Sequence, residues 1–253
     1  MEKLVYVLWG DGTPESGDAI RDSLVTGTVP RLQQFGGRGI AVNVHDSDAA
    51  KAPSPVPVPA GEDPHVAEVC VWLDSYDRRD GVDEAIADAG LRYAGYLVTE
   101  SLYEDYGTTP HAQPRTWPDG TRSPGVLTVS LVHRPVGLDY ATWIDRWHGT
   151  QSPLSGELQP RCRYVRNEVV RAVTAGAPLI DGIVEEAWPS AAHLADPMLF
   201  FNAAGDRERL ARNISAMIES VNSCLDLRRL RTSTMSEYLM SGQRQAASGG
   251  TSS

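Results

Sequence analysis

Residues 133–154 hold the side chains that are best suited to bind and transform a small molecule. Trp143, Trp147 and Gln151 are spaced four residues apart, and His148 follows Trp147 directly. Side chains four residues apart share a face of an α-helix, so this pattern predicts a helix that forms one wall of a pocket. A histidine can exchange a proton near neutral pH, an amide can hold a carbonyl or hydroxyl group, and an indole ring can stack on a planar ligand.

Each of these residues also has a structural alternative. His148 can transfer a proton, or it can make a local hydrogen bond at the edge of the helix. Gln151 can orient a ligand oxygen or cap the helix end. Trp147 and Trp143 can contact a ligand ring or fill the hydrophobic core, and the spacing leaves both roles open.

Two later strands supply the remaining candidates for ligand binding. Tyr164 and Asn167 are three residues apart, which places them on opposite faces of a regular strand. Asp181 and Glu185 share one face of the next strand by parity. A carboxylate that faces the helices would lose water, its pKa would rise, and it could act as a general base. The alternative is a carboxylate in solvent or at an interface.

The elements that must position these residues occur in the same order twice. The hydrophobic pattern predicts strand, helix, strand, strand, helix and strand in each half of the chain. The expected strands of the first half are 3–9, 38–45, 67–73 and 92–102, and those of the second half are 126–133, 163–170, 182–188 and one within 226–234. Asp139 and Asp206 are expected to cap the two helices of the second half.

This order predicts an α+β fold made of two tandem ferredoxin-like repeats (βαββαβ). Each sheet would leave one apolar face bare, and two sheets in one chain can cover each other as an intrachain α/β barrel. The expected organisation is a degenerate repeat in residues 1–106, a linker in 107–124, a second repeat in 125–240 and a disordered tail in 241–253. Residues 47–64 are rich in proline and predict an extended insertion in the first repeat.

Composition narrows the class of protein. The net charge is −10, and residues 1–124 carry the whole acidic excess, so we expect no nucleic-acid partner. No apolar run is long enough to span a membrane and no secretion signal is visible at the N-terminus. Three separated cysteines at 70, 162 and 224 predict free thiols in the cytoplasm. No metal-binding cysteine or histidine pair is present, so the sequence predicts no metal site.

The second half resembles the EthD-like branch of the dimeric α+β barrel superfamily over about 110 residues. The resemblance rests on Arg134, Gly137-Leu138-Asp139, Trp143, Trp147 and Gln151-Ser152-Pro153-Leu154, followed by Tyr164-Val165-Arg166-Asn167 and Asp181-Gly182-Ile183-Val184-Glu185. It implies a barrel that acts on aromatic or polyketide-like compounds as a cyclase, dehydratase, lactone isomerase or small monooxygenase. The family histidine is replaced by Gln151, which cannot exchange a proton, and the neighbouring His148 is the candidate substitute.

Three functions follow from the residues and the resemblance. The first is a cofactor-independent lyase, isomerase or cyclase that acts on a small hydrophobic or aromatic carbonyl metabolite, with His148 moving the proton. The second is a binding or delivery protein that uses the same hydrophobic cleft in the second half. The third is a cofactor-less monooxygenase. All three require no cofactor, and a homodimer is compatible with each.

Overall fold

The computed structural model describes residues 1–56 and 58–240. The predicted disordered tail, residues 241–253, lies outside the described residues. In the described part of the chain no helix is both long enough and apolar enough to cross a membrane.

The strands and helices of the first half follow the predicted order. The four strands are β1 (Glu2–Trp9), β2 (Arg38–Val44), β3 (His65–Leu73) and β4 (Arg92–Glu104). The helices are α1 (Pro14–Ser23), α2 (Val29–Gln34) and α3 (Asp80–Ala87). The proline-rich insertion begins with a short helical turn at Ala49–Lys51 rather than as an extended segment.

The second half repeats this order with additional short helices. Its strands are β5 (Val126–Val132), β6 (Arg163–Ala172), β7 (Gly182–Trp188) and β8 (Arg231–Leu239). Its helices are α4 (Tyr140–Ile144), α5 (Ser152–Leu158), α6 (Ala192–Ala195), α7 (Pro197–Phe200) and α8 (Arg207–Cys224). Asp139 and Asp206 accept backbone N–H groups at the starts of α4 and α8, which confirms both predicted caps.

The prediction for the last strand was wrong by about five residues. We expected it within 226–234, and it runs from Arg231 to Leu239. Asp226 instead forms a turn in which its side chain accepts the backbone N–H of Arg228. The strand, RTSTMSEYL, is mainly polar, so the apolar run that marks a buried strand is absent from it.

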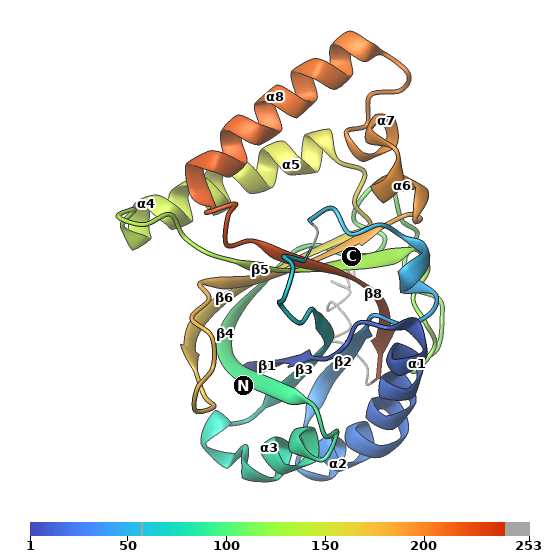
Figure 1. The fold of residues 1–253 in the computed structure, drawn as a ribbon, viewed down its shortest axis with the longest axis vertical. Coiled ribbons are helices and arrows are strands. Elements are labelled where there is room, and N and C mark those ends of the chain that lie inside the picture. Colours follow the sequence, from blue (N-terminus) through green and yellow to red (C-terminus); the bar gives the residue numbers. More distant parts are fainter. Residues whose placement is uncertain (57, 241–253) are drawn as a thin grey trace, which may run out of the picture.

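The eight strands close into one antiparallel barrel in the order β1-β3-β2-β8-β5-β7-β6-β4 (Figure 1). Strands β2 and β8 pair from Ala41↔Leu239 to Val44↔Ser236, and β4 pairs with β6 from Tyr96↔Ala172 onward. These two seams join the halves of the chain. We predicted that the two sheets would cover each other as an intrachain barrel. They form this barrel by hydrogen bonding between their edge strands, so no free edge strand is left in it.

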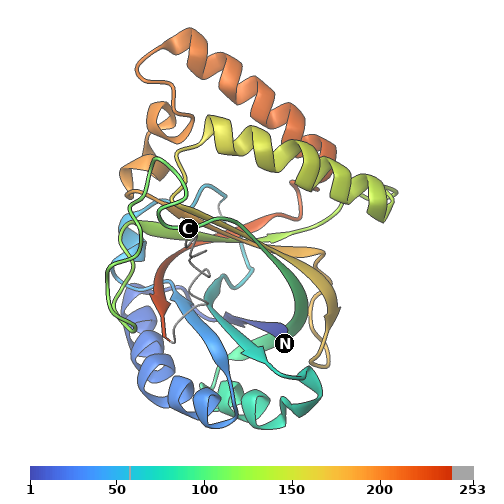
Figure 2. The ribbon, with the colours of Figure 1, turned by 180° about the vertical axis from the view of Figure 1, so that it is seen from behind.

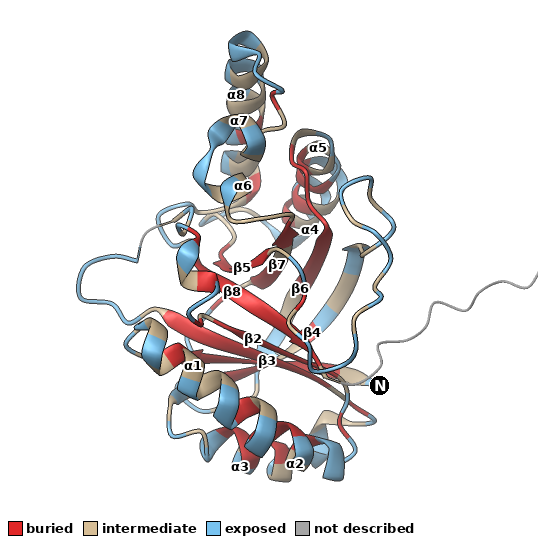
Figure 3. Cartoon of the chain, turned by 90° about the vertical axis from the view of Figure 1, so that its right-hand side faces the viewer, coloured by how far each residue is buried: buried red, intermediate tan, exposed pale blue. Residues whose placement is uncertain are grey.

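The helices form two layers on opposite sides of the barrel. Helices α1, α2 and α3 cover the strands of the first half, whereas α4, α5 and α8 cover those of the second (Figure 1, Figure 2). Strand side chains alternate between the barrel interior and a helix layer, so most strand residues are buried on both faces while the outer helix faces are exposed (Figure 3). Chemistry-bearing side chains can thus lie either inside the barrel or under a helix layer.

The first long helical segment of each half contains a π-helical stretch, at Leu24–Thr28 and at Asp145–Gln151. In each, a backbone N–H reaches back five residues: Val29 donates to Leu24 and Ser152 donates to Trp147. A proline follows directly, and a proline cannot donate the usual bond four residues back. We predicted regular α-helical spacing for residues 143–151. The π-helical stretch changes the angle between successive side chains, so His148 and Gln151 lie at other positions around the helix axis than predicted.

Candidate functional site

The barrel interior is mainly apolar and becomes charged towards one end. Inward-facing Val5, Val7, Leu127, Val129 and Met235 belong to one hydrophobic cluster. Near the end of the barrel where β1 begins, Lys3, Glu68, Glu185 and Arg163 take inward positions, and each is almost fully buried. Charged groups are rarely buried unless they are paired, so their partners define what this end of the barrel can do.

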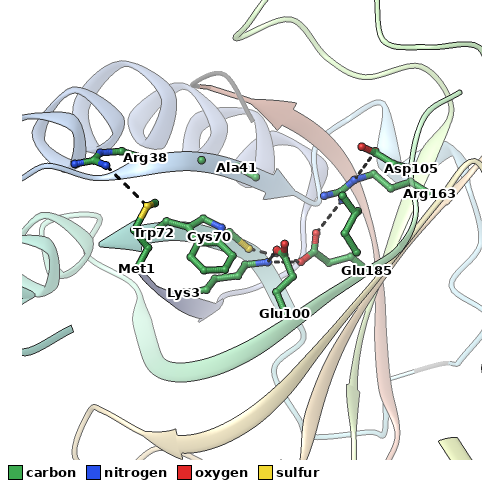
Figure 4. Close-up of a pocket in the computed structure, with 12 residues that line it drawn as sticks. Met1, Lys3, Arg38, Ala41, Cys70, Trp72, Glu100, Asp105, Arg163 and Glu185 are labelled. Carbon is green, nitrogen blue, oxygen red and sulfur yellow. Dashed lines mark hydrogen bonds and ion pairs between the residues drawn. The ribbon is translucent and has the colours of Figure 1, made fainter. Parts of the chain in front are cut away.

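A cavity of about 540 Å³ opens beside this charged group. Lys3, Cys70, Arg163 and Glu185 form its charged end, and these side chains point toward one another from four strands (Figure 4). Its other walls include one indole ring and one aliphatic side chain, those of Trp72 and Leu102. A second cavity of about 480 Å³ opens at Trp9, Arg92 and His133.

Lys3 is the central cation of the charged end. Its Nζ donates to Glu100 Oε2 at 2.7 Å and to Asn167 Oδ1 at 2.8 Å. It also contacts Glu185 Oε1 at 3.3 Å. Burial alone would lower the pKa of Lys3, but its interactions with Cys70, Glu185 and Glu100 outweigh burial and raise it, so the ammonium stays charged.

Glu185 is the anion at the centre of the same group. Its Oε1 accepts from Asn167 Nδ2 at 2.8 Å, and its Oε2 accepts from Arg163 at 3.1 Å. Burial raises the pKa of a carboxyl group, yet Lys3 and Arg163 outweigh burial here and lower the pKa of Glu185 to about 2. Glu185 therefore faces the barrel interior between two cations, a position that differs from both alternatives considered for it, under the helices or in solvent.

Arg163 extends the group toward β8. Its guanidinium donates to Glu237 Oε1 at 3.0 Å and forms an ion pair with Asp105 at 3.4 Å. Glu237 in turn accepts the hydroxyl of Tyr106 at 2.8 Å. Burial and the neighbouring Glu237 raise the pKa of Tyr106 well above its usual range, so this hydroxyl remains a donor.

Glu68 and Cys70 complete the charged end from β3. Asn43 Nδ2 donates to Glu68 Oε2 at 2.6 Å, and the thiol of Cys70 lies 3.7 Å from Glu185 Oε1. Burial, followed by the charge of Glu185, raises the pKa of Glu68 to about 8. Burial and Glu68 raise the pKa of the Cys70 thiol. Oxygen and sulfur atoms of Glu68, Cys70 and Glu185 all lie within 4.8 Å of one another, so these three residues are the ones that could hold a metal ion.

The predicted helix residues lie outside the barrel. Trp143 and Trp147 are buried under the helix layer of the second half, with ring centroids 5.0 Å apart. Trp147 Nε1 donates to Tyr164 OH at 3.3 Å. A Cβ at Gly182 would come within 2.8 Å of the Trp147 ring, which shows how closely helix and strand approach. This indole therefore fills the space in which we expected a hollow.

His148 and Gln151 belong to the same helix layer. Burial, followed by the charge of Arg166, lowers the pKa of His148 to about 4, so the imidazole is neutral at pH 7. Gln151 is buried and its Nε2 points to the sulfur of Met217 at 3.3 Å. Among the described residues, His148 Nε2, Gln151 Oε1 and Trp143 Nε1 have no hydrogen-bond partner.

Neither of the two cavities, of about 540 and 480 Å³, is lined by Trp143, Trp147, His148 or Gln151. We expected a hydrophobic cleft within the second half, whereas the cavity of about 540 Å³ lies in the barrel interior and is lined from both halves. The reason is the closed barrel, which turns the inner faces of both sheets toward one shared space.

Tyr164 and Asn167 lie on opposite faces of β6, as their spacing predicted. Tyr164 packs under the helix layer, whereas Asn167 faces the barrel interior and contacts Lys3 and Glu185. Asp181 precedes β7, and its carboxylate accepts the backbone N–H of Arg134 at 2.9 Å, away from the charged end. Of the predicted site residues, the structure brings Glu185 and Asn167 together in the barrel interior, and it brings Trp143, Trp147 and Tyr164 together under the helix layer.

The sequence analysis missed Lys3, Glu68, Cys70 and Arg163. A signal was present, because Lys3 and Glu68 lie within otherwise apolar strands. A charge in a strand that is buried on both faces needs a partner across the interior. The identity of that partner depends on barrel closure, which no local pattern encodes.

Comparison with known proteins supports the fold and does not assign a family. No protein-family model matches the sequence, and no curated protein matches it. One solved structure, described as an anthrone oxidase-like protein, has a TM-score of 0.54 at 15% identity, and the alignment covers 97% of this chain and 96% of that one. This likeness supports the α+β fold with a closed antiparallel barrel of eight strands.

Weaker likenesses extend over similar lengths. A variant of chlorite dismutase from Candidatus Nitrospira defluvii has a TM-score of 0.43 at 9% identity, with 92% of this chain and 90% of that chain covered. A dye-decolorizing peroxidase from Bacteroides thetaiotaomicron has a TM-score of 0.44 at 8% identity, with 94% and 93% covered.

Proposed function

We propose that the cavity at the charged end of the barrel binds a small planar metabolite that carries a carbonyl or hydroxyl oxygen. The observation that carries this proposal is the composition of the cavity. Its volume of about 540 Å³ lies in the range of small-molecule sites, and it combines an indole and an aliphatic wall with a few fixed charges. A planar ring can stack on Trp72 while its oxygen reaches Lys3.

The charged end supports proton-transfer chemistry on such a ligand. The ammonium of Lys3 is held in place by Glu100 and Asn167, so it is already oriented when a ligand arrives. A fixed positive charge in a water-poor site stabilises an enolate or phenolate oxygen far better than the same charge does in water. The reaction class is therefore a lyase, isomerase or cyclase reaction that needs no organic cofactor and passes through an oxyanion.

Two other functions use the same cavity. The structure described as anthrone oxidase-like makes oxygenation of an aromatic ketone the first alternative. The second is binding or delivery without catalysis. It is favoured by the ion pairs that Lys3 and Glu185 already make with each other and with Glu100 and Arg163, which a catalytic step would have to loosen.

We also propose that the barrel consists of two tandem ferredoxin-like repeats, of which the second is EthD-like. Each half has the same strand order, β4-β1-β3-β2 and β8-β5-β7-β6. Each half also has a π-helical stretch followed by a proline in its first long helical segment. A single duplication explains this shared backbone irregularity more simply than two independent origins do.

The helix layer remains a second candidate site. The unpartnered atoms of His148 and Gln151 favour it, because buried polar atoms are normally satisfied by protein, water or ligand. In this alternative His148 transfers the proton and Trp147 or Trp143 contacts the ring of the ligand. Tyr164 holds Trp147 through its hydroxyl group.

Binding of two matched probes tests the proposal. 4-Nitrophenolate and 4-nitroanisole differ in the oxyanion, and quenching of tryptophan fluorescence reports the binding of each. We expect the phenolate to bind more tightly, Trp72→Leu to weaken both probes about tenfold, and Lys3→Met to abolish the preference for the phenolate. Because Lys3→Met leaves Glu185 with fewer partners and can unfold the chain, Leu102→Trp provides a second variant that fills the half-exposed mouth without changing charge.

His148→Gln is the matched control, since it changes the helix layer and leaves the cavity intact. Loss of binding in His148→Gln, with Leu102→Trp unaffected, would move the site to the helix layer.

Exchange of the α-protons of 2-tetralone in D₂O, measured by NMR, distinguishes an enzyme from a delivery protein. An enzyme accelerates exchange in a Lys3-dependent way, whereas a delivery protein binds the ketone without accelerating it.

A further inference from the structure

Two strands that face each other across the barrel bring three metal-binding side chains together. Glu68 and Cys70 come from β3 and Glu185 comes from β7, and these strands are four places apart in the circle of eight. Their donor atoms nevertheless lie within 4.8 Å of one another, and all three side chains are buried. The cluster therefore occupies the interior of the barrel and is not a surface group of acidic residues.

Two buried oxygen atoms at this cluster lack partners. Among the described residues, Glu68 Oε1 and Asn43 Oδ1 have no hydrogen-bond partner, although neither residue is exposed. Asn43 contacts Glu68 through its Nδ2 at 2.6 Å, so its free oxygen belongs to the same group. Buried polar atoms are nearly always satisfied, and a cation bound at this cluster would satisfy Glu68 Oε1.

Glu68 has no ion-pair partner among the described residues. Lys3 and Arg163 form ion pairs with Glu100, Asp105, Glu185 and Glu237, and neither forms one with Glu68. A buried carboxylate is costly unless an opposite charge is close by. A bound divalent cation would supply that charge at Glu68.

We propose that Glu68, Cys70 and Glu185 bind a divalent transition metal of the zinc class inside the barrel. One thiolate and two carboxylates are a donor set that Zn²⁺ and Co²⁺ accept, whereas Mg²⁺ and Ca²⁺ prefer oxygen alone. Three protein ligands leave a fourth position open, and the cavity beside Cys70 and Glu185 provides both a path of entry and room for a ligand there.

Lys3 can yield its share of Glu185 to the metal. Its contact with Glu185 is the longest of its three at 3.3 Å, and it keeps Glu100 and Asn167 at 2.7 and 2.8 Å. Ligands of a tetrahedral zinc ion lie about 3.5 Å apart, given metal–ligand distances of about 2.0–2.3 Å. The donor atoms lie within 4.8 Å of one another, and Cys70 Sγ is already 3.7 Å from Glu185 Oε1, so they need to approach by at most about 1.3 Å, which rotamer adjustment beside a cavity allows.

Titration with Co²⁺ tests this site directly. The protein is first treated with EDTA and dialysed, and the absorbance is then followed as Co²⁺ is added. We expect about one ion to bind per chain, with a sulfur-to-cobalt charge-transfer band in the near ultraviolet, and Zn²⁺ to displace the cobalt. Cys70→Ser should remove the charge-transfer band, and Glu68→Gln should weaken binding by at least about 100-fold, because even supporting residues of metal sites contribute 10- to 100-fold.

Cys162→Ser is the matched control, because Cys162 is another buried thiol but accompanies no carboxylate in a metal-binding group of the described residues. It should keep the band and the affinity. Near-ultraviolet circular dichroism of each metal-free variant establishes that it is folded. A titration without a Cys70-dependent band, or one in which Glu68→Gln binds as tightly as the parent, would overturn the proposal.

The metal readout is independent of the proposed ligand. Binding of 4-nitrophenolate in EDTA tests the cavity alone, and the Co²⁺ titration needs no organic ligand. A metal site without probe binding would overturn only the proposed function, and probe binding without a metal site would overturn only this inference.

Discussion

At the scale of single residues, surroundings decide what each ionisable group can do. Glu185 and Glu68 are both buried glutamates inside the same barrel. Two cations lower the pKa of Glu185 to about 2, whereas burial and the charge of Glu185 raise that of Glu68 to about 8. A residue type and a strand face are therefore insufficient to assign an acid or a base.

A buried histidine gives a prediction for acid stability. His65 is 3% exposed, and its Nε2 lies 2.9 Å from the carbonyl of Val129, so this nitrogen carries the proton of the neutral ring. Burial lowers its pKa to about 4, below the value near 6.5 of the unfolded chain. Protonation thus favours unfolding. We expect stability to be complete above pH 6.5 and to fall by up to about 3 kcal/mol as the pH drops from 6.5 to 4.

His65→Gln provides the comparison, because glutamine can donate to the same carbonyl and does not titrate. Urea unfolding at pH 7.5, 5.5 and 4.5 should show a shallower loss of stability with falling pH in the variant than in the parent. Equal slopes would show that the acid sensitivity comes from other groups.

At the scale of elements, caps and prolines determine where the helices begin and how they are wound. Asp139 starts α4 by accepting the backbone N–H of Thr142 at 3.0 Å. Pro153 lacks the donor that an α-helix would use there, and the preceding residues form a π-helical stretch. The aromatic face of this segment is consequently set by backbone geometry as much as by side-chain spacing.

Removal of the cap should be measurable. We expect Asp139→Ala to lower the free energy of unfolding by about 1 kcal/mol, because a donor at the helix start loses its partner. Asp145→Ala, an exposed aspartate six residues later in the same segment, should change it by less than about 0.5 kcal/mol. Urea denaturation of the two variants measures the difference, and similar losses in both would contradict the role of the cap.

At the scale of the whole molecule, the two halves depend on each other. Two strand pairs close the barrel between the halves, and Lys3 of the first half bonds Asn167 and Glu185 of the second. A separated half would expose two edge strands and the inner face of its sheet, with charges that have lost their partners.

We therefore expect residues 1–124 and 125–253, expressed separately, to be aggregated or oligomeric, and to form a 1:1 complex when produced together. Size-exclusion chromatography with light scattering measures the mass, and near-ultraviolet circular dichroism reports the packing of the tryptophans. A folded monomer of either half would show that the barrel seams are dispensable.

The sequence by itself determined the number, order and approximate bounds of the strands, both caps and the opposite faces of Tyr164 and Asn167. These features follow from local periodicity and capping, which neighbouring residues encode. The tertiary structure decided which faces became the shared interior and which became helix-covered core. It placed Glu185 beside Lys3, which is 182 residues away in the sequence, and it filled the expected hollow with Trp147. Pairing across a closed barrel depends on long-range contacts, and the spacing of residues along one segment does not specify them.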